Sequence, residues 1–221
     1  TAVIKDHASQ KRRNFISKFL IYFFLIVITA CMLLPFLWML SSSFKGQEAI
    51  RTIPIRWIPE RPTLEGYERV FNMQGFSFTR ASLNSLLLAV GCTVAEVASS
   101  AMAAFVFAKL PFKGSGKVFG IYLATMMIPT QVTMIPLFVV MNQLSLINHY
   151  ASMILPSVFK PFAVFMLVQQ MRTIPGDYLD AAKIDGASTF RIYRSVMLPL
   201  CVPTLATLSI TTFMESWNDY L

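Results

Sequence analysis

Charge is what this sequence has least of. Only 14% of its 221 residues are Asp, Glu, Lys or Arg, whereas a soluble globular domain has roughly 25%. Hydrophobic residues make up 55% of the chain, and the mean hydropathy is +0.58. Because the uncharged residues gather in long runs, the deficit indicates a protein of the lipid bilayer rather than a soluble domain with a large core.

Histidine and cysteine are also scarce. The two histidines, His7 and His149, are far apart in the sequence, and the cysteines lie in apolar runs without paired spacing, at Cys31, Cys92 and Cys201. This pattern argues against a disulfide framework or a metal site, and it leaves no Cys/His or Ser/His/Asp set. No catalytic residue and no metal ligand is therefore predicted.

A phosphate-binding loop of the form G-x-x-x-x-G-K-[ST] is missing too. The nearest stretch, "PFKGSGKV", lacks the first glycine and has Val118 where the metal-binding hydroxyl belongs. The chain is therefore expected to be neither an enzyme nor an ATP-binding protein.

The basic residues give a net charge of +8, but they lie mainly at the ends of apolar runs. Such residues set the orientation of membrane spans, whereas a nucleic-acid site needs them clustered on one face. We therefore expect no nucleic-acid partner.

Five apolar segments are candidates for membrane spans. The first four are each longer than the roughly 20 residues that a helix needs to cross about 30 Å of hydrocarbon. No alternating strand pattern is present, so the spans are expected to be helices. They cover residues 19–40, 81–108, 118–141, 150–171 and about 197 to the end. The sequence thus predicts an all-α polytopic membrane protein.

The connections between these segments predict an orientation. Residues 1–18 carry five bases against one acid, and "KLPFKGSGK" after the second segment carries three lysines. Both are expected in the cytoplasm. The connection 142–149 has no Lys or Arg and is expected outside. Alternation then places the loop 41–80 outside and the loop 172–196 in the cytoplasm.

The loop 172–196 contains the start and stop signals of two short helices. Asp177 is placed to cap a helix over residues 178–184, and Asp180 can reach back to it as in a capping box. Gly186 occupies the position where a left-handed glycine ends a helix, and Ser188 can cap a second one.

Two interpretations of this loop remain open on physical grounds. It can be a connector that rests on the membrane surface, or it can be a docking element for a soluble partner. The small pair Ala181-Ala182 would let another protein approach the first helix closely.

The wider pattern resembles a known motif. "DYLDAAKIDGASTFRIYRSVMLPL" is similar to the EAA loop of ABC-importer permeases, which has an acid, two alanines, a glycine and a later apolar-Leu-Pro at fixed spacing. Here these are Asp180, Ala181-Ala182, Gly186 and Leu198-Pro199. Asp180 replaces the usual glutamate, which keeps the charge and shortens its reach by one methylene.

Other stretches narrow the resemblance to the carbohydrate-uptake permeases, the maltose-permease-G-like subunits. They are "WIPERPTLEGYERVF", "NSLLLA", "MIPTQVTMIPLF", "IDGAS" with "LPL", and "SWNDYL". The resemblance implies a type I ABC-importer transmembrane domain over residues 19–221. It also implies six spans, of which five are present here, with the last one truncated.

In that family the EAA loop forms a coupling helix in a groove of a cytoplasmic ATPase. The resemblance therefore implies that Tyr178, Leu179 and Ile184 offer apolar contact and that Asp180 pairs with a base on the ATPase. The full set of implied coupling residues is Tyr178, Leu179, Asp180, Ala181, Ala182, Ile184, Asp185 and Gly186.

The same resemblance implies the partners and the location. These are a homologous second membrane subunit, a dimeric ATP-binding-cassette ATPase that holds ATP and Mg, and an extracytoplasmic solute-binding protein. The chain would lie in the bacterial inner membrane among lipid, with its N-terminus in the cytoplasm and with no cofactor of its own.

Charged residues inside the spans are candidates for the transport path, because charge in hydrocarbon is costly unless it is paired or solvated. Glu96 and Lys160 can form a structural pair, line a watery vestibule beside the prolines near Lys160, or contact a sugar. The complete list of path candidates is Glu96, Gln131, Lys160, Glu215 and Asn218.

The leading prediction is a translocation subunit for a sugar or oligosaccharide. The cargo could instead be a polyol, glycerol phosphate or peptide, because the EAA loop is common to importers. A membrane enzyme or scaffold with a docking helix is the alternative from another class. Co-purification of an ATPase would separate these classes.

Overall fold

A computed structural model describes residues 2–110 and 112–219, and every regular element in these two ranges is a helix. The chain forms two compact units, Thr1–Thr79 and Arg80–Leu221. Three of the described helices are long and apolar enough to cross a membrane, and the number reaches five if each of two bent helix pairs crosses once. The predicted all-α class is confirmed.

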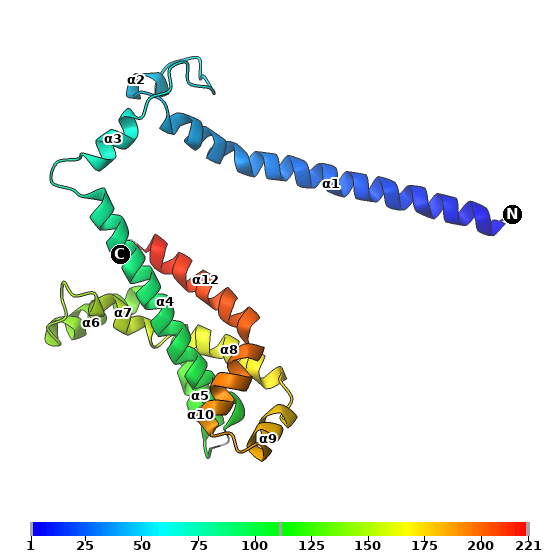
Figure 1. Ribbon diagram of the computed structural model, residues 1–221, viewed down its shortest axis with the longest axis vertical. Coiled ribbons are helices and arrows are strands. Elements are labelled where there is room, and N and C mark those ends of the chain that lie inside the picture. The colour runs from blue at the N-terminus through cyan, green and yellow to red at the C-terminus, as the bar shows by residue number, and fades with distance from the viewer. Residues whose placement is uncertain (1, 111, 220–221) are drawn as a thin grey trace. The chain divides into compact units, whose positions relative to one another are not determined.

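The first unit is dominated by one helix, α1 (Ala2–Ser43), drawn in blue in Figure 1. It contains the predicted span 19–40 and continues without a break through the predicted tail. From Ile16 onward its apolar side chains are mostly exposed within this unit. Such a surface is stable in lipid or against another membrane helix, which agrees with a span.

The chain after α1 folds back on the end of that helix. Lys45 is buried there, with its ammonium 4.1 Å from the ring centre of Trp38 and its Nζ donating to the carbonyl of Arg56 at 2.6 Å. The ring of Trp57 packs on Trp38 edge to face, 5.2 Å between centroids. The loop also contains two short helices, α2 (Gln47–Ile50) and α3 (Glu65–Phe71). The predicted external loop is thus a folded element.

The second unit begins with α4 (Phe78–Lys109), which contains the predicted span 81–108. The predicted span 118–141 is not one straight helix. It consists of α5 (Ser115–Ala124), η1 (Thr125–Met127) and α6 (Thr130–Gln143), with a bend of 101°. Ile128, with ψ 115°, precedes Pro129, and proline drives the preceding residue out of the helical region. The single continuous helix expected here was wrong.

The predicted span 150–171 is broken once. It consists of α7 (Ala151–Ser157) and α8 (Pro161–Thr173), which together are long and apolar enough to cross a membrane. Side chains of α4 bond to the carbonyls near the break. Ser99 Oγ donates to the Val158 carbonyl at 2.9 Å, and Cys92 Sγ lies 3.6 Å from the Met153 carbonyl. A broken helix is tolerable in a membrane when its freed carbonyls have such partners.

The rest of the chain is α9 (Asp177–Ile184), α10 (Thr189–Ile192), the π-helical turn η2 (Tyr193–Met197), α11 (Leu198–Leu200) and α12 (Val202–Asn218). The predicted fifth span, beginning near residue 197, is bent by 79° between α11 and α12. Its last two residues, 220 and 221, lie outside the described part of the chain.

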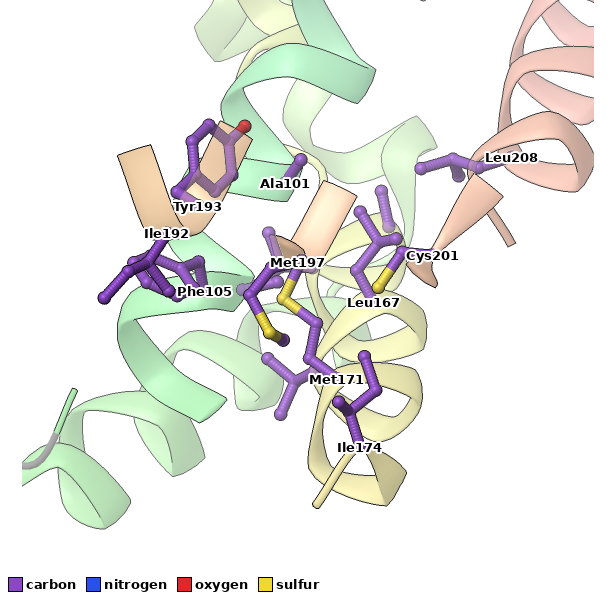
Figure 2. Close-up of a cluster of buried hydrophobic side chains, with 14 of the residues drawn as sticks. Ala101, Phe105, Leu167, Met171, Ile174, Ile192, Tyr193, Met197, Cys201 and Leu208 are labelled. Carbon is purple, nitrogen blue, oxygen red and sulfur yellow. The ribbon is translucent and has the colours of Figure 1, made fainter. Parts of the chain in front are cut away.

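The core of the second unit is built around α8. Ala163, Val164, Leu167, Val168 and Met171 are 0–2% exposed, and their spacing places them on one face of that helix. Figure 2 shows Leu167, Met171, Met197 and Cys201 gathered between α8 and the chain that leads into α12. Phe105 of α4 packs on Tyr193 of η2, with ring centres 5.4 Å apart. This core carries the polar loop that follows α8.

Candidate functional site

The helix α9 lies at one end of the second unit (Figure 1) and begins at Asp177. Gly176, with φ −63° and ψ −28°, is its N-cap, and no side chain caps the helix start. The predicted Asp177 cap and its capping box with Asp180 are therefore wrong. Asp180 instead forms an exposed ion pair with Lys183, 2.9 Å between Oδ1 and Nζ. Its carboxylate thus remains at the surface.

The end of α9 has the geometry that the sequence predicts. Gly186 has φ +74°, and its N–H donates to the Lys183 carbonyl at 2.9 Å. The N–H of Ala187 donates to the Ala182 carbonyl at 3.0 Å, which completes a Schellman motif. Ser188 then caps α10 by accepting from the Arg191 N–H at 3.3 Å. The joint between α9 and α10 is therefore fixed by hydrogen bonds of three consecutive residues, Gly186, Ala187 and Ser188.

The two faces of α9 differ sharply. Tyr178 and Ile184 are 52% and 86% exposed, whereas Leu179 is 6% exposed and belongs to the core of the unit. Ala182 packs partly against the same core. The expectation that Leu179 offers apolar contact to a partner is wrong, because its side chain is already covered by this chain. Leu179 anchors α9, while Tyr178 and Ile184 form its outward apolar surface.

A second group of candidates lies where α4, α8 and α12 meet. Glu96 is 4% exposed and accepts a hydrogen bond from the hydroxyl of Thr212 on α12. Its other oxygen, Oε2, has no hydrogen-bond partner among the described residues. Lys160, at the break before α8, pairs with Glu215 at 3.8 Å, and both side chains are about half exposed or more. Of the alternatives for Glu96 and Lys160, a direct pair between them is not formed, because Glu96 bonds to Thr212 and Lys160 pairs with Glu215.

The remaining two path candidates are placed differently. Gln131 is exposed in the first turn of α6, and it has no hydrogen bond to the other four candidates in the described part of the chain. Asn218, at the end of α12, bonds back to the Met214 carbonyl at 2.8 Å. Trp217 beside it stacks on Phe213, 5.9 Å between ring centres. The structure thus brings together Glu96, Lys160 and Glu215, while Gln131 stands apart from them.

These residues offer hydrogen bonds and charge. No group of three or more His, Cys, Asp or Glu side chains is close enough to hold a metal ion within the described ranges.

The family model for the binding-protein-dependent transport system inner membrane component matches residues 96–221, which include both groups of candidates. The chain belongs to this family. It is therefore a permease subunit of a transporter and an inner membrane protein.

Relatives of this permease subunit support the assignment over nearly its whole length. It is 35% identical to the trehalose transport system permease protein SugB of Mycobacterium tuberculosis, over 86% of this chain and 68% of the relative. It is 34% identical to the arabinooligosaccharides transport system permease protein AraQ of Halalkalibacterium halodurans, over 85% of this chain and 67% of the relative. It is 30% identical to the sn-glycerol-3-phosphate transport system permease protein UgpE of Salmonella typhi, over 89% of this chain and 72% of the relative.

A solved structure with the same fold is that of a bacterial ABC transporter involved in the import of the acidic polysaccharide alginate. The TM-score is 0.83, with 23% sequence identity, over 95% of this permease subunit and 74% of that chain. This likeness confirms the predicted ABC-importer transmembrane-domain fold.

One feature of α12 in this permease subunit was not predicted from the sequence. Thr204, Thr207, Thr211, Glu215 and Asn218 follow one another at steps of three, four, four and three residues. That spacing places them on one face of the helix, and all are exposed or half-buried. The threonines were overlooked because each is apolar enough to pass in a hydropathy window, whereas their period was visible in the sequence.

Proposed function

We propose that this chain is the translocation subunit of an ATP-driven importer for a sugar or oligosaccharide. The cargo is suggested by relatives whose names state trehalose and arabinooligosaccharides. The coupling to ATP is suggested by α9, an exposed short helix mounted on a packed core. The proposal depends on this observation, that α9 is exposed on one face and attached to the packed core by the other.

In this proposal α9 is seated in a cytoplasmic ATPase, and movement of the ATPase displaces the helix. A displaced helix transmits motion only if it is held rigidly at both ends. Leu179 fixes the body of α9 in the core, and the Schellman motif at Gly186 fixes its far end. Lys109 of α4 donates to the carbonyl of Ile174, 2.6 Å, just before α9 begins. Motion of α9 would thus reach α4 and α8 directly and α12 through η2.

The outward surface of α9 is small, with Tyr178 and Ile184 as its large apolar side chains and Asp180 and Lys183 as its charges. An exposed ion pair contributes about 0–1 kcal/mol, so docking of the ATPase on this helix alone would be weak. The assembly therefore needs further contacts. We assign these to a homologous second membrane subunit, whose own coupling helix would dock on the second ATPase copy. A solute-binding protein would bind to the assembly from outside.

The charges near the transport path favour a neutral cargo. One cation, Lys160, stands among two acids, Glu96 and Glu215, and its nearest acid is already paired with it. A phosphate-bearing cargo would have to compete with Glu215 for that lysine. Glycerol phosphate remains the second candidate, because the relative UgpE is named for it at 30% identity.

The proposed orientation is testable by labelling with a membrane-impermeant thiol reagent. We expect Ile58→Cys, in the loop 41–80, to react in intact cells, because Ile58 is 82% exposed. Asp185→Cys, in the loop 172–196, should react only after the cells are permeabilised. Both changes are made with Cys31→Ser, since Cys31 is the exposed native thiol. Labelling of Asp185→Cys in intact cells would reverse the orientation.

The proposed assembly is testable by mass measurement of the intact complex. We expect one copy of this chain, one homologous membrane subunit and two copies of an ATPase, because this chain offers one coupling helix. In vesicles, its solute-binding protein should stimulate ATP hydrolysis when loaded from a panel of sugars. The opposing results are a transport-competent chain without an ATPase, or stimulation by glycerol phosphate and by no sugar.

A further inference from the structure

A cleft of about 390 Å³ lies between α8 and α12. It is closer to α9 along both helices than the charged group of Glu96, Lys160 and Glu215 is. Most of the surface that lines it is apolar, but five of its seven lining residues carry a neutral hydrogen-bonding group, two amides and three hydroxyls. They are Gln169, Gln170 and Thr173 from α8 and Thr204 and Thr207 from α12. Met166 and Pro203 complete the lining with apolar surface.

Such a face is unsuited to lipid. Gln169, Thr173 and Thr207 are exposed in this chain, and the hydroxyls of Thr173 and Thr207 reach only carbonyls of their own helices, Gln170 and Pro203. Polar groups exposed to hydrocarbon are costly, and in membrane spans they turn toward protein or water-filled cavities. The other side of α12 has the opposite character, with Val202, Ala206, Ile210 and Phe213. The helix therefore has one side for lipid or apolar protein and one side for polar surroundings.

The cleft is continuous with the charged group described above. On α12 the polar face runs from Thr204 and Thr207 through Thr211 to Glu215. On α8, residues 161–168 are all apolar, and polarity returns only at Lys160, at the break before the helix, which pairs with Glu215. The two helices are in contact. The cleft is thus the uncharged end of a polar track on α12, whose other end holds Glu215 of the ion pair.

We propose that this cleft is a cargo subsite, which takes a neutral, hydroxyl-rich solute at the α9 end of the track. This inference rests on the proposed importer function and adds a binding site to it. Amides and hydroxyls both donate and accept hydrogen bonds, which matches the hydroxyls of a sugar. Met166 and Pro203 offer apolar surface to its C–H face. The absence of charge from the lining gives an anionic cargo nothing to pair with.

The position explains how binding and coupling are related. Thr173 is the last residue of α8, and the core residue Ile174 and then α9 follow it directly. Gln169 and Gln170 lie one turn before, next to Val168 and Met171 of the core face. A movement of α9 that shifts α8 against α12 would change the width of the cleft. Cargo would therefore bind there in one arrangement of the two helices and leave in the other.

Cysteine accessibility in the full complex tests the subsite. Thr207→Cys and Gln169→Cys are compared with Ala206→Cys, whose side chain lies about 100° around α12 from Thr207. A small charged thiol reagent should label the first two at least about tenfold faster than Ala206→Cys, because a thiol in apolar surroundings is poorly ionised. Equal rates at Thr207→Cys and Ala206→Cys, or slow labelling of all three positions, would place the face against lipid or the second membrane subunit and overturn the proposal.

Protection by solute is the second readout. Trehalose and an arabinooligosaccharide are supplied separately, and sn-glycerol 3-phosphate serves as the anionic comparison. A neutral sugar at about three times its dissociation constant should slow labelling of both Thr207→Cys and Gln169→Cys about fourfold. Protection by the phosphate alone, protection at one position only, or no protection by either sugar contradicts the subsite. Stimulation of the ATPase by loaded binding protein, measured on the same vesicles, reports separately whether the proposed importer function holds.

Discussion

Gly186→Val is expected to separate ATP hydrolysis from transport. The complex should assemble, retain its ATPase and hydrolyse ATP, but import little solute. Gly186 has φ +74°, and a Cβ built on it would meet nothing within 4 Å. The cost of valine therefore comes from the backbone and not from a clash. A left-handed conformation costs a residue with a side chain about 1–2 kcal/mol, which is a factor of roughly 5–30 in the population of the native joint.

Two further variants show whether conformation is the cause. Gly186→Asn should transport nearly normally, because asparagine tolerates the left-handed region. Gly176→Ala, at the other end of α9, should also be nearly normal, since Gly176 has φ −63° and open space around its Cα. The measurements are solute uptake and binding-protein-stimulated ATP hydrolysis in vesicles. Normal uptake by Gly186→Val with the ATPase bound would make the loop a surface connector.

The sequence predicted the end of α9 better than its beginning. A glycine that ends a helix and a serine that starts the next are local signals, and Gly186 and Ser188 both act as expected. The start was misplaced by one residue because Gly176 is already in the helical region. Asp177 therefore lies within the first turn, where its side chain is no longer placed to accept from the backbone.

Bends in the spans were harder to predict than the spans themselves. Hydropathy sums over a segment and does not record its direction, so residues 118–141 passed as one helix. The signals for the 101° bend were Pro129 and the extended residue before it. Pro136, in contrast, lies inside α6 without ending it. Proline alone therefore marks a possible break, and packing decides which one occurs.

The charged residues show the same limit. Depth along a helix can be counted from the sequence, but the direction in which a side chain points around the axis depends on the neighbouring helices. Lys160 is extended, with φ −96° and ψ 103°, at the break before α8, beside the prolines that the sequence analysis linked to a vestibule. That position turns it to Glu215 on α12 rather than to Glu96 on α4. The sequence thus predicted that a charged residue, Lys160, lies within the span, but it did not predict that Glu215 is its partner.

Leu179→Ala and Ile184→Ala are expected to fail in different ways, although both remove an aliphatic side chain from α9. Leu179 is 6% exposed in the core, so its truncation leaves a cavity. A buried leucine cut to alanine costs about 2–5 kcal/mol, and here the cost falls on the attachment of α9. The ATPase should still bind to α9, but solute uptake per ATP hydrolysed should fall severalfold. Leu179→Met, which nearly conserves volume, should restore most of it.

Ile184 is 86% exposed, so its truncation should not affect the fold of this chain. Its loss should instead weaken docking of the ATPase, because Ile184 and Tyr178 are the large apolar groups on the outward face of α9. The expected result is less ATPase retained on the purified membrane subunits, with normal uptake per ATP hydrolysed by the complexes that remain. Both quantities are measured on one preparation of each variant. If the two variants lose ATPase and coupling in the same proportion, then α9 does not have an inner anchoring face and an outer docking face, and the division of roles is wrong.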